Sequence, residues 1–76
     1  MALMSHVVIA ELVANVLSVD VEVGQVLEAG AQCVVLESMK MEIPVLTEYA
    51  GVVTEVVVKV GDVVRDGDPM VILDRA

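Results

Sequence analysis

The stretch VDVEVGQV at residues 19–26 decides how this chain folds, because it returns 37 residues later as VVVKVGDV at residues 56–63. Both copies place valine at every second position and then reach a glycine. Such period-2 alternation is typical of a half-buried β-strand, with one face toward a core and the other toward water. We therefore predict two equivalent strands, each followed by a glycine turn, at Gly24 and at Gly61. The other three glycines, Gly30, Gly51 and Gly67, are turn candidates as well.

The repeat extends well beyond these eight residues. Residues 7–37 align with residues 44–74 without a gap, and 11 of the 31 pairs are identical. Valine meets valine easily by chance in this sequence, but the spacing of two glycines also coincides, since Gly30 aligns with Gly67. An internal repeat of this size predicts a pseudo-twofold, in which each half supplies about four short strands. Neither half could bury its apolar face alone, so we expect the halves to pack as a sandwich or flattened barrel.

The composition favours the same fold class and excludes several functions. Valine accounts for 20 of the 76 residues, and β-branched side chains pack well on a pleated surface, so we expect an all-β domain without a helix. The net charge of −8 argues against partners such as nucleic acid or an anionic membrane. No apolar stretch approaches the roughly 20 residues of a membrane-spanning helix. The length allows one domain, which we place at residues 7–76 after a disordered tail at residues 1–6.

Cys33 is the only cysteine, which excludes an internal disulfide and a multi-cysteine zinc site. The repeat aligns it with Met70, so we expect a buried core position rather than a reactive thiol. A nucleophile pair with His6 would need hydrogen-bond reach, and nothing in the sequence suggests it. We expect the acidic residues on turns and solvated faces, and we predict neither a catalytic residue nor a metal site. A single cysteine and no secretion signal favour the reducing cytoplasm.

The repeat leaves one segment unexplained, the junction SMKMEI at residues 38–43. A turn must lie here, yet the segment has no Gly, Asn or Asp, which tight hairpins prefer. One explanation is a solvated turn lysine, Lys40, with Met39 and Met41 packing back on the end of the barrel, and composition alone favours it. The other is a lysine presented for covalent modification, between flexible and polarizable side chains that suit a partner surface.

The segment ESMKMEIP at residues 37–44 resembles the biotin attachment motif of the biotinyl domain family, whose core is Met-Lys-Met. The resemblance covers residues 7–74 and is closest to the small stand-alone biotin/lipoyl attachment proteins of bacteria. It implies a flattened barrel or sandwich of two four-stranded antiparallel sheets, with the modified lysine at a hairpin tip that joins them. The chain departs from the family at Ser38, where Ala is typical. It also has no room for the thumb of some acetyl-CoA carboxylase carriers.

Carried over to this chain, the resemblance makes Lys40 the site of covalent biotin attachment and Met39 and Met41 its recognition flanks. The neighbouring residues of the motif are Glu37, Ser38 and Glu42. Biotin protein ligase would form an amide at Lys40, and the arm would carry a carboxyl group from a biotin carboxylase to a carboxyltransferase. The acceptor would be an acyl-CoA or a keto acid. The protein itself would be a non-catalytic, monomeric carrier.

Two other functions stay open on the sequence alone. In the sister lipoyl domains the lysine usually follows Asp and precedes Ala or Val. The paired methionines here therefore favour biotin, with lipoate as the alternative cofactor. The remaining possibility is an unmodified β-domain that acts in protein interaction.

Overall fold

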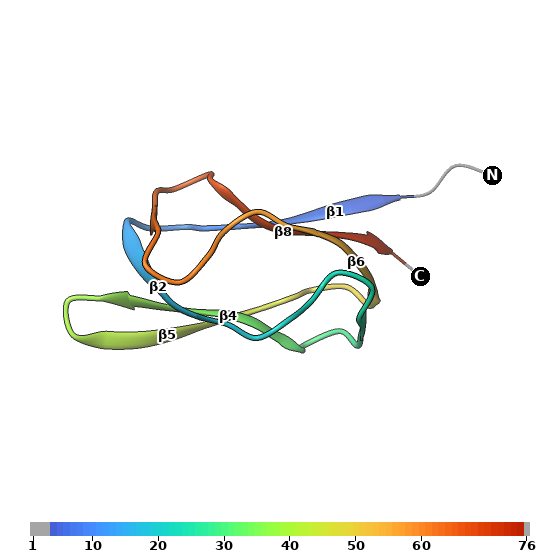
Figure 1. Cartoon of the computed structure of the whole chain (residues 1–76), viewed down its shortest axis with the longest axis horizontal. Helices are drawn as coiled ribbons and strands as arrows, with labels where there is room; N and C mark the ends of the chain where they lie inside the picture. The colour runs from blue at the N-terminus through green and yellow to red at the C-terminus, as the bar shows by residue number, and fades with distance from the viewer. Residues whose placement is uncertain (1–3, 76) are drawn as a thin grey trace.

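The computed structural model describes residues 4–75, and its strands repeat with the spacing of the sequence (Figure 1). The strands of the first half are β1 (Ser5–Ile9), β2 (Ala14–Val19), β3 (Val26–Leu27) and β4 (Gln32–Ser38). The strands of the second half are β5 (Met41–Leu46), β6 (Gly51–Val56), β7 (Val63–Val64) and β8 (Pro69–Arg75). A shift of 37 residues converts the bounds of β2, β3 and β4 into those of β6, β7 and β8. The predicted all-β fold and its pseudo-twofold are therefore confirmed.

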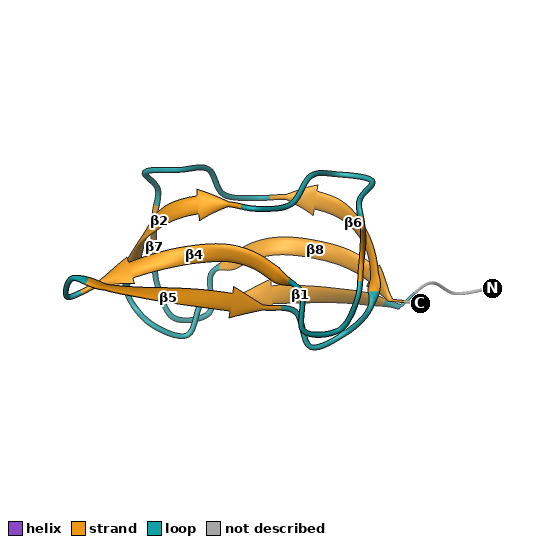
Figure 2. Ribbon diagram, turned by 90° about the horizontal axis from the view of Figure 1, so that it is seen from below, coloured by secondary structure: helices purple, strands orange, loops and turns teal. Residues whose placement is uncertain are grey.

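The strands form two four-stranded antiparallel sheets, in the orders β1-β8-β6-β3 and β5-β4-β2-β7 (Figure 2). The same shift converts the first order into the second, so the pseudo-twofold exchanges the sheets. Each sheet contains two strands from each half. The expectation that the junction hairpin joins the two sheets is wrong, because its strands β4 and β5 are neighbours in one sheet. The halves interlace, since β1 and β3 pair only with strands of the second half.

The repeated stretch that predicted a strand is in fact a connection between the sheets. β2 ends at Val19, and residues 20–25 cross to the opposite sheet. The alternation persists along this crossing, since Val21 is 6% exposed and Val23 is 64% exposed. The amide of Gly24 donates to the carbonyl of Val53 at 2.7 Å. The prediction of a strand was wrong here because an extended connection with one buried face has the same side-chain alternation as a paired strand.

The core lies between the sheets and is built from matched residues of the two halves. Fully buried matched pairs are Cys33 with Met70, Val34 with Val71 and Leu36 with Leu73. In β4 the consecutive residues Cys33 and Val34 both face inward, because a bulge opposite β5 leaves Cys33 without a register partner. The predicted core position of Cys33 is therefore confirmed. Residues 4–75 contain no helix of the length and apolarity that a membrane crossing requires.

One glycine departs from its predicted role as a turn residue. The other four glycines have positive φ, but Gly51 begins β6 and is buried. A Cβ atom added to Gly51 would overlap the backbone carbonyl of Asp74 on the neighbouring strand β8. Gly51 is therefore required for the close approach of two strands, not for a turn.

The first strand begins earlier than the predicted domain boundary. His6 lies within β1, and the amide of Arg75 donates to the carbonyl of Met4 at 2.8 Å, so part of the predicted tail belongs to the fold. The rest of that tail, residues 1–3, lies outside the described residues. The ring of His6 meets the edge of Tyr49 at 4.7 Å between centroids, and the Arg75 guanidinium lies 3.8 Å above the same Tyr49 ring. This end of the molecule is thus closed by side-chain packing.

Burial raises the pKa of the Cys33 thiol, because desolvation exceeds the opposing hydrogen bond from the Thr47 backbone, and the nearby charge of Asp20 adds to the increase. Only the thiolate attacks alkylating agents. We therefore expect iodoacetamide to label Cys33 at least about 100-fold more slowly in the native protein than in guanidinium. The measurement is intact mass against time at one pH. Equal labelling rates would contradict the burial of the thiol.

The same shift predicts the sign of a pH effect on stability. The pKa of Cys33 is higher in the folded than in the unfolded chain, so this group's contribution is fully present below the unfolded pKa. The contribution is lost as the pH rises through the folded pKa. Cys33→Ala should therefore flatten the alkaline side of the stability curve.

Candidate functional site

The junction forms a β-hairpin whose tip lies at one end of the molecule (Figures 1 and 2). β4 and β5 pair up to Ser38 and Met41, which leaves Met39 and Lys40 as a two-residue loop. The molecule measures 43 Å along its longest axis and 18 Å along each of the others. The start of β1 and the end of β8 lie at the opposite end of this axis. The tip therefore lies at the end of the molecule away from the start of β1 and the end of β8.

Both loop residues hold a backbone conformation that side chains rarely adopt. The φ angle is 52° at Met39 and 65° at Lys40, and within residues 4–75 no other non-glycine residue has a positive φ. Positive φ at both central positions is the pattern of a type I′ turn, which matches the twist of the flanking strands and favours Asn-Gly. Left-handed backbone costs an L-residue roughly 1–2 kcal/mol. The strand pairing thus imposes a strained turn on a sequence without turn residues, as is common at functional sites.

The side chains of this turn face solvent. Met39 is 91% exposed and Met41 is 65% exposed, and Lys40 between them is exposed as well. The explanation in which the methionines pack back on the end of the barrel is therefore wrong, because both side chains are largely exposed to solvent. Exposed thioethers give flexible, polarizable contact with an apolar surface. The tip thus offers one primary amine between two adaptable apolar side chains.

The other residues of the motif surround the base of the turn. Glu37 and Ser38 end β4 and are half-buried, whereas Glu42 lies in β5 and is exposed. The register places Glu37 directly opposite Glu42. Like charges in this arrangement destabilise a strand pair. In a chain of net charge −8, such a pair suits recognition by a basic partner surface.

The pseudo-twofold explains why the fold has one such tip. The equivalent of the β4–β5 pair is the β8–β1 pair, in which Arg75 and Met4 take the places of Ser38 and Met41. At that position the described strands begin and end instead of turning. The symmetric fold therefore carries a single strained hairpin.

The described part of the chain forms no cluster of side chains with metal-binding geometry. No three His, Cys, Asp or Glu side chains within residues 4–75 lie close enough to hold a metal ion. His6 packs against Tyr49, and the thiol of buried Cys33 is 3.8 Å from the carbonyl oxygen of Ala31. The two residues considered as a nucleophile pair are thus each engaged elsewhere.

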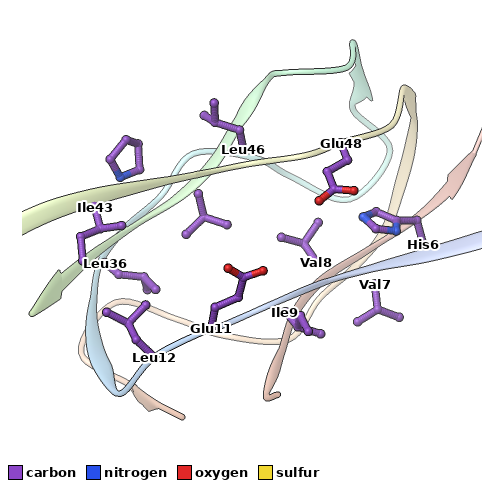
Figure 3. Close-up of a pocket in the computed structure, with 12 residues that line it drawn as sticks. His6, Val7, Val8, Ile9, Glu11, Leu12, Leu36, Ile43, Leu46 and Glu48 are labelled. Atoms are coloured by element: carbon purple, nitrogen blue, oxygen red, sulfur yellow. The ribbon is translucent and has the colours of Figure 1, made fainter. Parts of the chain in front are cut away.

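The sequence reasoning missed a groove between β1 and β5, the edge strands of the two sheets (Figure 3). Its volume is about 290 Å³. Glu11 and Glu48 both line it and are exposed, as the sequence predicted for them. The repeat could have indicated that these two residues belong together, because the shift of 37 residues aligns Glu11 with Glu48.

Replacing Met39 by Asn should stabilise the fold, because Asn adopts positive φ more readily than other residues that carry a Cβ. We expect the free energy of unfolding to rise by about 0.5–1 kcal/mol and the melting temperature by about 2–8 °C. Circular dichroism melts would measure it. Met41→Asn is the matched control, since Met41 lies in β5 without positive φ and should show no gain. A Met39→Asn variant that melts like the parent would contradict strain in the turn.

Comparison with known proteins connects this geometry to named relatives. The family described as "Biotin-requiring enzyme" matches residues 5–73. The "Biotinylated protein TB7.3 homolog" of Mycobacterium leprae is 50% identical over 70 residues, which cover 92% of this chain and 99% of that protein. The "Biotin/lipoyl attachment protein" of Bacillus subtilis is 39% identical over 66 residues, covering 87% and 90%. Part of a single-chain, multi-domain long-chain acyl-CoA carboxylase superposes with a TM-score of 0.88 and 36% identity, covering 95% of this chain and 7% of the larger one.

Proposed function

Because the chain belongs to the biotin/lipoyl attachment family, we propose that it is a biotin carboxyl carrier in which Lys40 is the attachment site. One observation carries the proposal: Lys40 is exposed in a two-residue turn between two exposed methionines. A ligase can enclose this tip without separating the strands behind it. The function then resides on a loop that a stiff scaffold holds in place.

The tip suits a covalently attached group better than a bound one. An amide needs an accessible amine, which Lys40 offers, and it needs no enclosing pocket in this chain. Met39 and Met41 would contact the ligase, while Glu37, Ser38 and Glu42 would complete the surface that it recognises. Biotin, once attached, supplies the atom that carries a carboxyl group. The chain itself then acts as a non-catalytic tether.

The carrier would meet three partners in turn. Biotin protein ligase would modify Lys40, a biotin carboxylase would load the arm, and a carboxyltransferase would unload it onto an acyl-CoA or a keto acid. The similarity to part of a long-chain acyl-CoA carboxylase supports this association. When docked, a tethered group reaches an effective concentration of about mM, so weak and transient complexes suffice. We place the carrier in the cytoplasm, since its one cysteine, Cys33, is free and buried. We also propose that it acts as a monomer.

The cofactor is tested by giving the purified chain to two ligases in parallel. One reaction contains biotin protein ligase, ATP and biotin, and the other contains lipoate ligase, ATP and lipoate. We expect the intact mass to increase by one biotin in the first reaction and not to change in the second. Peptide mapping should locate the biotin at Lys40 and not at Lys59, which is also exposed.

Each alternative has its own outcome in this experiment. Addition of lipoate alone would make the chain a lipoyl carrier, the second function that the name of the Bacillus subtilis relative allows. If neither ligase adds its cofactor, although each modifies its own control carrier, the chain is the unmodified interaction module. Biotin at Lys59 would contradict the proposed site.

A further inference from the structure

We propose that the groove between β1 and β5 is a docking site for an extended segment of a partner protein that inserts an arginine or lysine side chain. None of residues 37–42 lines this groove, so it is separate from the hairpin tip. Ten of its twelve lining residues form five pairs related by the shift of 37 residues. The groove therefore lies on the pseudo-twofold axis, and its lining residues are drawn in Figure 3.

Two carboxylates define the charge of this groove. Glu11 follows β1 and Glu48 follows β5, and Figure 3 shows their side chains pointing toward each other from opposite sides. Among the 11 identical pairs of the repeat, this pair alone is neither apolar nor glycine. Both carboxylates are exposed, and a cation held between them would be attracted to both.

The chain does not provide that cation from its own described residues. The lining contains no Lys or Arg, and His6 is its only other ionisable side chain. Arg75 instead lies over the ring of Tyr49. Glu11 and Glu48 can therefore complement a positive charge that a partner supplies.

The other lining residues of the groove favour a cation carried on a long side chain. Nine of its twelve lining residues are apolar, Val8, Leu36 and Val45 among them, although its accessible surface is at least as polar as apolar. Lysine and arginine lay an aliphatic stem along apolar surface and keep a cationic head at a polar site. A guanidinium can also donate to two carboxylates at once, which favours arginine. The volume of about 290 Å³ is at the lower limit of small-molecule sites, roughly 300 Å³, and suits one long side chain.

The backbone at the groove favours an extended segment as the bearer of this side chain. β1 and β5 are edge strands, each with one hydrogen-bonded neighbour in its sheet. The free N–H and C=O groups of an edge can pair with an added strand. Pro44 lacks an N–H in the middle of β5, so β1 is the better edge for pairing.

The proposal is tested by titrating a peptide into the ¹⁵N-labelled protein and following amide chemical shifts. The probe is a capped heptapeptide, Val-Thr-Val-Arg-Val-Thr-Val, and the control peptide has glutamine in place of arginine. We expect shifts concentrated in β1 and at Glu11 and Glu48. The control peptide should bind about tenfold more weakly, the ratio that corresponds to one charge-assisted hydrogen bond.

Variants of the protein locate the interaction. Glu11→Gln and Glu48→Gln should each weaken binding of the arginine peptide by about tenfold. Glu55→Gln removes an exposed carboxylate of β6 outside the groove and should leave affinity unchanged. Thermal melts of all three variants establish that they fold. Absence of shifts in β1 at millimolar peptide, or equal affinity for both peptides, would overturn the proposal, as would equal losses in all three variants.

The outcome of the peptide titration does not depend on the proposed carrier function. Biotinylation of Glu11→Gln and Glu48→Gln by the ligase should match that of the parent, because neither residue belongs to β4, β5 or the turn that carries Lys40. A failed peptide titration therefore leaves the attachment site standing. If biotinylation fails, the peptide titration still tests the docking proposal for the groove.

Discussion

Lys40→Arg is expected to abolish biotin incorporation. Arginine keeps the positive charge and nearly the length of lysine, but its guanidinium is not deprotonated in proteins and cannot attack an activated acyl group. Incubation with biotin protein ligase, ATP and biotin should give no mass increase in the variant, a loss of at least about 1000-fold in rate relative to the parent. The parent should be modified once under the same conditions.

Lys59→Arg provides the matched control, since Lys59 is the other lysine of the chain and is also exposed. This variant should accept biotin at the rate of the parent. Both variants should melt within about 0.5 kcal/mol of the parent, because surface substitutions rarely change stability more. Incorporation that survives in Lys40→Arg and disappears in Lys59→Arg would move the site to the second half of the repeat.

Val21→Asp is expected to unfold most of the protein. Val21 is 6% exposed and packs in the core, although it lies in the connection between the sheets and not in a strand. An unpaired carboxylate buried there should destabilise the fold by about 3–5 kcal/mol. Domains of this size have a free energy of unfolding near the lower end of about 5–15 kcal/mol, so such a loss removes most of it. Circular dichroism and a thermal melt would measure it.

Val23→Asp is the matched control, because it makes the same replacement two residues further along the same connection. Val23 is 64% exposed, so its change should stay within about 0.5 kcal/mol. The difference between the two variants then reports burial rather than the loss of a valine. Equal melting temperatures for both variants would contradict the inward orientation of Val21.

The core follows the pseudo-twofold, whereas the hairpin tip that presents Lys40 does not, and this division suits a carrier. The core is built twice from one pattern, and Leu36 and Leu73 are its matched, fully buried leucines. The hairpin tip with Met39 and Lys40 occurs once, because the described strands begin and end where its counterpart would lie. The repeated core thus stabilises the fold, and the single strained turn presents Lys40 to solvent. Met39→Asn separates the two contributions, since it should raise stability while removing one thioether from the tip.

Several elements could be predicted from the sequence because their signal is local. Valine alternation and the glycines at positive φ, such as Gly24 and Gly61, predicted the strand class and the turns. The repeat predicted the core position of Cys33, since its partner Met70 is apolar. Gly51 was misassigned as a turn residue, because a glycine required by close strand approach looks the same in sequence as one required by a turn.

The sequence by itself determined that the chain is one β-domain made of two copies of the same half, and it singled out Lys40 at the junction as the candidate for modification. Both conclusions follow from patterns along the chain. Only the tertiary structure decided that the halves interlace and that Lys40 lies in a turn of positive φ. It alone placed Glu11 and Glu48 across one groove. These features depend on which strands pair and at what register, and pairing between distant segments leaves no periodic trace in either segment alone.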